Sequence, residues 1–292
     1  MEFVKYLING LSLGSVYAII ALGYTMVYGI AKMLNFAHGD VIMVGAYICF
    51  FAASNFDMPS VLGVISAIVV CTILGILIER FAYKPLRQAA SLAVLITAIG
   101  VSYFLQNAAQ LLWGSNPRIF QPLLGDGGIP IFGDEVLQYN TLLTIGISIA
   151  IMIALTFFTK FTKTGKAMRA VSEDKSAAEL MGISVNKTIS ITFAIGSALA
   201  AIAGVLLCSS YPKLVPTTGA MPGIKAFTAA VFGGIGSIPG ALVGGVILGI
   251  IEIFSGAYIS TELSNAIVFA VLIIVLLVKP TGLLGKKIRE KV

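Results

Sequence analysis

The chain has 292 residues, of which 58% are hydrophobic and only 11% are charged, and its formal net charge is +6. Soluble domains are about 45–50% apolar and about 25% charged, so this chain has too few polar residues to cover a soluble globule. Its basic stretches flank apolar segments, which disfavours nucleic acid as a partner and indicates a membrane protein.

Windows without charged residues indicate the membrane segments. Asp, Glu, Lys and Arg are absent from residues 6–31, 41–56, 58–78, 88–117, 136–159, 188–212, 226–251 and 263–278. Lipid offers the backbone no hydrogen-bond partners, so these windows should be helical. The sequence predicts an all-α fold, a polytopic integral membrane helical bundle built as one domain over residues 1–292. We expect about 8–10 membrane segments, including broken or re-entrant half-helices, because a full span needs about 20 apolar residues.

The front of the chain allows two interpretations. Residues 9–30 form a good span, but residues 31–54 interrupt an apolar stretch with Lys32, Asn35, His38, Gly39 and Asp40. In one interpretation, residues 41–54 are a short span and the N-terminus lies outside. In the other, residues 31–54 form a broken pair of half-helices that enters and leaves on the outer side, with the N-terminus inside. We favour the broken pair, because interrupted apolar segments often mark a transporter's pathway.

Later spans follow a simpler pattern. Residues 60–80, 91–113, 139–159 and 188–210 are expected to cross the membrane in alternation. Residues 223–279 must then cross an odd number of times, and they divide into 223–234, 240–258 and 263–279. The first of these is only about 18 Å long at about 1.5 Å per residue. We therefore expect a half-helix buried in protein.

The distribution of Lys and Arg predicts which loops face the cytoplasm. Short loops rich in these residues stay inside. Loop 160–187, the turn around 80–87 and the tail from 279 are basic, so we place them in the cytoplasm. Loop 114–138 has only Arg118 against Asp126, Asp134 and Glu135, so we place it outside.

Loop 160–187 contains a predicted short helix over Lys175–Met181. Asp174 can cap its N-terminus, and Gly182 suits the left-handed position after its last turn. One face is expected to carry Ala177, Ala178 and Met181, with Lys175 on the solvated side and Glu179 also away from that face. Such a face favours a docking helix, and a solvated surface helix is the alternative.

Four polar residues in apolar stretches are candidates for a translocation pathway: Asn35, His38, Asp40 and Glu252. Ionisable groups inside a membrane are costly and often functional. Structural roles are the alternative, such as a buried structural hydrogen bond for His38 or Asp40. Asp40 can cap a helix that starts at Val41, and Glu252 can tie neighbouring helices together.

The sequence contains no pattern typical of a catalytic, metal or ATP site. It has a single His, and its three cysteines lie in apolar windows as expected for packing residues: Cys49, Cys71 and Cys208. The phosphate-binding pattern GxxxxGK[ST] is missing, because Gly165-Lys166 is followed by Ala167. Lys160 stands where the first glycine of that pattern belongs. We expect no metal, no cofactor and no enzymatic activity, so any ATP hydrolysis would belong to a partner.

Four segments carry a family resemblance: NGLSLGSVYAIIALGYTMVYGI at 9–30, LNFAHGDVIMVGAY at 34–47, TGKAMRAVSEDKSAAELMGISVN at 164–186 and AFTAAVFGGIGSIPGALVGGVILGIIE at 226–252. They resemble the branched-chain amino-acid permease family of ABC transporters (LivH type). The segments cover both ends and the middle, so the resemblance extends over essentially the whole chain.

The resemblance implies a permease that forms the translocation pathway for leucine, isoleucine and valine in the bacterial plasma (inner) membrane. It implies several partners: a homologous second permease, two ATP-binding subunits, an extracytoplasmic substrate-binding protein and the surrounding lipid. Loop 160–187 matches the family's coupling loop, which implies ATPase contacts for Arg169, Glu173, Ala177, Ala178, Met181 and Gly182.

Alternative functions stay open at this point. Permeases for urea or short-chain amides belong to the same broad group. An ion-coupled secondary transporter would need buried acids, for which Asp40 and Glu252 are the plausible residues. A membrane enzyme would need a catalytic spacing that the sequence lacks.

Overall fold

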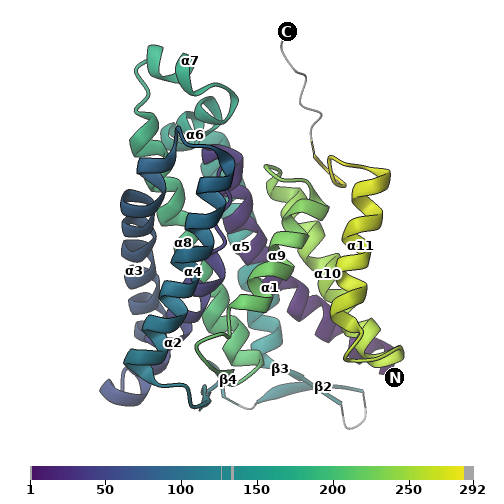
Figure 1. Cartoon of the computed structure of the whole chain (residues 1–292). Helices are drawn as coiled ribbons and strands as arrows, with labels where there is room; N and C mark the ends of the chain where they lie inside the picture. The colour runs from purple at the N-terminus through teal and green to yellow at the C-terminus, as the bar shows by residue number, and fades with distance from the viewer. Residues whose placement is uncertain (1, 126, 133–134, 286–292) are drawn as a thin grey trace.

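A computed structural model describes residues 2–125, 127–132 and 135–285. In these residues the chain forms a helical membrane bundle (Figure 1). Seven of its helices are long and apolar enough to cross a membrane. Together with two shorter helices, α9 and α11, they match the predicted number of about 8–10 membrane segments. Asp126, Asp134 and the basic tail beyond residue 285 lie outside the described residues.

The α-helices follow one another along the chain, most of them with short connections. They are α1 (Glu2–Ala31), α2 (His38–Phe56), α3 (Ser60–Ile78), α4 (Ser91–Trp113), α5 (Tyr139–Phe161), α6 (Lys163–Glu173), α7 (Lys175–Leu180), α8 (Val185–Ser210), α9 (Ala220–Gly233), α10 (Ile238–Tyr258) and α11 (Ser264–Val278). After α3 the chain continues through a π turn, Glu79–Tyr83, and a 3₁₀ turn, Lys84–Leu86. The spans predicted from hydropathy over residues 60–80, 91–113, 139–159 and 188–210 are thus confirmed as α3, α4, α5 and α8.

Two small antiparallel sheets lie at the end of the bundle opposite to α6 and α7 (Figure 1). The strand β1 (Arg118–Ile119) pairs with β4 (Lys213–Leu214), and β2 (Gly128–Phe132) pairs with β3 (Glu135–Gln138). We call this end the strand end and the other the α7 end. The α7 end carries loop 160–187, which the distribution of positive charge places in the cytoplasm.

The centre of the bundle is α1, which packs tightly against α10. In its apolar stretch 89% of the residues are buried, against 17% in α4, so α1 is surrounded by protein while α4 faces lipid. Glycines permit the close approach of α1 and α10. A Cβ on Gly14 would lie 2.7 Å from the Cα of Val246, and one on Gly10 would lie 2.9 Å from the Cα of Ile250. Small residues at four-residue spacing pack helices in this way in lipid.

The broken pair predicted for residues 31–54 is wrong. After the non-helical segment 32–37, α2 is a single helix of 19 residues. The start of α1 packs against the strand end of α10, where the Phe3 and Phe254 rings lie 5.2 Å apart, so the N-terminus lies on the outer side. Residues 33–37 of this segment are buried or partly buried in protein, and Asn35 is only 4% exposed. The irregular backbone is therefore tolerated without the chain turning back.

The half-helix predicted near residue 223 is confirmed as α9, which has 14 residues. It follows the extended stretch after α8, and its N-terminus lies inside the bundle against the first turn of α2. A Cβ on Gly39 would lie 2.7 Å from the carbonyl oxygen of Gly219, so only glycines allow this approach. The two interrupted segments of the chain therefore meet within the bundle.

Candidate functional site

Loop 160–187 folds into two short capped helices at the α7 end. Thr162 caps α6 by accepting a hydrogen bond from the Gly165 amide at 2.9 Å. Asp174 caps α7 by accepting one from the Ala177 amide at 3.0 Å, as predicted. Gly182 has φ +79°, the left-handed conformation predicted for it. These caps give a short helix a defined orientation at the surface of the bundle.

The face predicted for α7 is wrong. Ala178 is 3% exposed and packs inward, whereas Leu180 is 89% and Met181 81% exposed. Only six residues are helical, and Met181 lies beyond the last turn with ψ 10°, so it leaves the face that Ala178 occupies. Of the other predicted coupling residues, Arg169, Glu173, Ala177 and Gly182 are exposed. Leu180 and Met181 form what we call the apolar tip, and sequence reasoning missed Leu180.

Lys175 does not lie on a solvated side as expected. It is half-buried, and its ammonium donates a hydrogen bond of 3.0 Å to the backbone carbonyl of Ala31, the last residue of α1. Burial lowers the pKa of Lys175, and the positive charges of Arg87 and Lys32 lower this pKa further. The ammonium is thus held in a partly desolvated, cationic environment between α7 and α1.

A second polar cluster joins the turn after α3 to α8. Glu79 is 1% exposed, forms an ion pair with Arg87 and accepts a 2.7 Å hydrogen bond from the Ser190 hydroxyl. Arg87 also donates to Asn186. The sequence analysis did not select these residues. A Glu at the end of a span, eight positions before an Arg, was the available signal.

Three of the predicted pathway residues lie close together around the start of α2. The Asn35 side chain accepts a 2.9 Å hydrogen bond from the Tyr83 hydroxyl, and Asp40 accepts one of 2.9 Å from Gln106. The His38 ring is 1% exposed and packs edge-on against Tyr24, with centroids 4.6 Å apart. Asp40 lies in the first turn of a helix that begins at His38, so it is not the cap of a helix starting at Val41.

A small cavity lies beside this cluster, between α1, residues 33–35 and α9. It is lined by Tyr24, Val27, Tyr28, Met33, Leu34, Asn35, Phe227, Ala230 and Ile235. The walls are mostly apolar, with the Asn35 amide and the tyrosines as polar groups. The cavity holds about 10 Å³, room for about one water molecule, so a solute could enter only if the surrounding helices moved apart.

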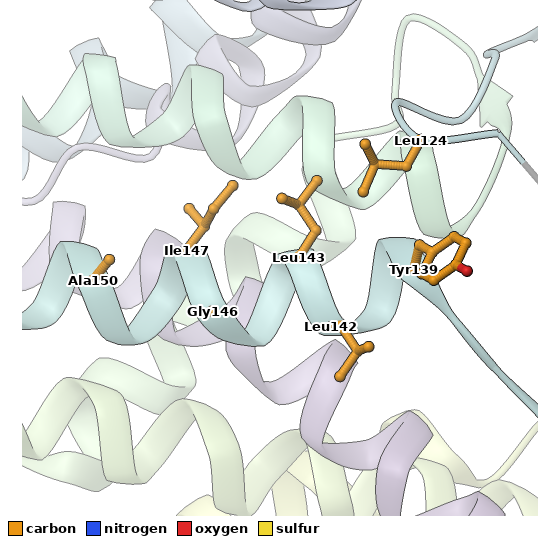
Figure 2. Close-up of a pocket in the computed structure, with 7 residues that line it drawn as sticks. All are labelled: Leu124, Tyr139, Leu142, Leu143, Gly146, Ile147 and Ala150. Atoms are coloured by element: carbon orange, nitrogen blue, oxygen red, sulfur yellow. The ribbon is translucent and has the colours of Figure 1, made fainter. Parts of the chain in front are cut away.

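A wider and more open groove runs along α5 near the strand end (Figure 2). Its seven lining residues are Leu124, Tyr139, Leu142, Leu143, Gly146, Ile147 and Ala150, and none of them is charged. Figure 2 shows Leu143, Ile147 and Ala150 on one side of α5, with Leu124 on the loop that faces them, and Leu142 on the opposite side. This lining suits acyl chains or another helix better than a zwitterionic solute.

Glu252 lies apart from the α2 cluster and ties three helices together. One carboxylate oxygen accepts a 2.9 Å hydrogen bond from the Tyr17 hydroxyl of α1. The other pairs with the ammonium of Lys225 on α9 at 2.6 Å. The structure therefore supports the interpretation of Glu252 as a tie between helices. Lys225 was missed, although a lysine within a short apolar segment was a signal for a buried partner.

Comparison with known proteins now adds to this geometry. Residues 6–276 match the family model described as "Branched-chain amino acid transport system / permease component". The chain belongs to this family. The high-affinity branched-chain amino acid permease protein LivH of Escherichia coli K12 is 46% identical, over 100% of this chain and 98% of the relative. The protein BraD of Pseudomonas aeruginosa is 44% identical over the same shares.

A solved structure confirms the fold of this family member. In PsaBC from Streptococcus pneumoniae, determined in complex with Fab, one chain superposes with a TM-score of 0.51 at 16% identity. The match covers 94% of this chain and 92% of that one, so the likeness concerns the whole bundle and shows the fold alone. The chain is a multi-pass permease of the inner membrane.

Proposed function

We infer that the chain is the membrane permease subunit of an ABC importer and forms the translocation pathway for leucine, isoleucine and valine. The observation that carries this inference is the 46% identity with a branched-chain amino acid permease over the whole chain. A permease for urea or short-chain amides is the second candidate, since it would share the same fold.

The partners follow from this assignment. We propose that the chain pairs with a homologous permease, that two ATP-binding subunits attach in the cytoplasm, and that an extracytoplasmic binding protein delivers the substrate. The chain is then a transport subunit, and ATP hydrolysis belongs to the attached subunits.

The ATPase contact is assigned to the α7 end. Leu180 and Met181 are exposed large apolar side chains outside the membrane segments, and such a surface favours a protein partner. Arg169, Glu173, Ala177 and Gly182 are also exposed on α6, α7 and the turn that follows, while the buried Ala178 anchors α7 to the bundle. We propose that the apolar tip inserts into a groove of an ATP-binding subunit.

The pathway is assigned to the region where α2 and α9 begin. Asn35, His38 and Asp40 lie there within the bundle, and the small apolar cavity lies beside them. Glu252 is proposed to hold α9 in place through Lys225 rather than to contact the solute. This arrangement disfavours ion coupling through Glu252, because its charge is already paired.

The mechanism is alternating access. ATP binding closes the ATPase pair and moves both α7 tips, which shifts the bundle between outward-facing and inward-facing states. A ligand shifts the populations of these two states only to the extent that it binds one state more tightly than the other.

Substrate competition tests the assignment. The complex, reconstituted with its ATPases and binding protein, should take up leucine, and excess isoleucine or valine should compete while excess urea should not. Competition by urea with none by valine would support the amide permease instead.

A further inference from the structure

The hydrogen bond between Lys175 and Ala31 joins the surface helix α7 to the central helix α1. The two residues are 144 positions apart, and the ammonium lies 3.0 Å from the carbonyl oxygen. The last carbonyls of a helix have no donor within the helix, and a cation near them is favoured by the helix dipole. Ala31 itself is fully buried, so its carbonyl depends on a partner supplied by another element.

The end of α1 is held in an unusual conformation at this point. Lys32 has φ +58°, the left-handed region that a residue other than glycine seldom adopts. The chain then enters residues 33–37, which are buried or partly buried and lead to His38. A displacement of Ala31 would therefore act both on α1 and on the start of α2.

The rest of α1 is suited to carry such a displacement. The helix has 30 residues, most of them buried, and the close glycine contacts at Gly10 and Gly14 join it to α10. Eight residues before its end, Gly23 lies directly against the His38 ring, with no room for a Cβ. A push on the C-terminal end of α1 thus reaches the region assigned to the pathway.

The distance from the apolar tip to this link is short. Lys175 begins the six-residue helix that Leu180 ends, and Ala178 packs the same helix inward. The ammonium is thus anchored at one end of α7 while the exposed tip lies at the other.

We propose that Lys175 is a coupling residue, whose hydrogen bond to the Ala31 carbonyl transmits the movement of α7 to α1. This rests on the proposed function, in which α7 contacts an ATP-binding subunit. Lys175 is then a positioning residue for transport and contributes no contact to the ATPase.

The test separates docking from transmission. Lys175→Met keeps the length of the side chain and removes the donor, Lys175→Arg keeps a cationic donor, and Lys166→Met is a matched change at an exposed lysine of α6. Lys175→Gln, which is shorter and neutral, is the second variant if Met lowers permease abundance. Each permease is reconstituted with its ATPases and binding protein, and three quantities are measured: ATPase co-purification, ATP hydrolysis and leucine uptake per ATP hydrolysed.

We expect the Met and Gln variants to bind the ATPases normally and to hydrolyse ATP. Their uptake per ATP should fall by about tenfold or more, because a hydrogen bond to a charged group is worth at least a factor of ten. Lys175→Arg should recover most of the uptake, and Lys166→Met should behave as the wild type.

Three results would overturn the inference. Unchanged uptake per ATP in Lys175→Met would show that the bond transmits nothing. Loss of ATPase co-purification would make Lys175 part of the docking surface. An Arg variant as defective as the Met variant would show that the donor is irrelevant. Failure of the wild-type permease to bind any ATPase would instead refute the proposed function itself.

Discussion

The ammonium of Lys225 lies 2.6 Å from a carboxylate oxygen of Glu252, inside the bundle between α9 and α10. Tyr17 of α1 donates to the other oxygen of the same carboxylate at 2.9 Å. One charged group therefore holds the half-helix to the two helices that pack through glycines. In a membrane interior both charges are tolerated because each has the other as its partner.

Removing one member of this pair should destabilise the permease. Lys225→Met leaves an unpaired carboxylate, and Glu252→Gln leaves an unpaired ammonium, so each should cost about 3–5 kcal/mol of the free energy of unfolding. The double variant leaves no buried charge at this site and retains an acceptor for Tyr17, so it should recover much of the loss. Thermal unfolding of the purified proteins measures this, and single variants as stable as the wild type would refute a role for the pair.

The apolar tip should determine ATPase binding. Leu180→Ser and Met181→Ser each remove a large apolar side chain from the proposed interface, worth about 1.5–3 kcal/mol, or about 10- to 100-fold in affinity. Co-purification of the ATPases should fall while permease abundance stays the same. Lys163→Ser, at an exposed site on α6, is the control. Normal co-purification by both serine variants would place the docking surface elsewhere.

The glycine contact between α1 and α10 should be intolerant of a single methyl group. A Cβ on Gly14 would lie 2.7 Å from the Cα of Val246, so Gly14→Ala should lower the free energy of unfolding by about 1–3 kcal/mol. Gly100 on α4 has no atom within 4 Å of such a Cβ. Gly100→Ala should be neutral or slightly stabilising by helix propensity. Equal unfolding temperatures for the two variants would contradict this packing.

The two ends of the bundle should be labelled from opposite sides of the membrane. Glu2→Cys should react with an impermeant thiol reagent only from outside, and Leu180→Cys only from the cytoplasm. The native cysteines are buried and should give little background. Labelling of Glu2→Cys only from the cytoplasm would restore the topology that the broken pair implied.

Features fixed by neighbouring residues could be predicted from the sequence. Hydropathy located the spans, because a helix in lipid must be apolar over its own length. The cap at Asp174 and the turn at Gly182 were also predictable, since each depends on the backbone next to it.

Features that depend on distant contacts could not be predicted in this way. Asp40 remains in a single helix because Gln106 of α4 supplies its hydrogen bond. Lys175 is half-buried because its ammonium binds the carbonyl of Ala31 at the end of α1. Ala178 faces inward because it packs against the rest of the bundle. No local sequence pattern contains these pairings. The predictions of the membrane side of the N-terminus and of the inward face of α7 were wrong for this reason.

The energy source of transport tests the central claim most directly. Proteoliposomes that contain the complete complex should take up leucine only when both the binding protein and ATP on the cytoplasmic face are present, and uptake should persist when proton and sodium gradients are abolished. Leucine uptake driven by such a gradient, without ATP or the binding protein, would contradict the account.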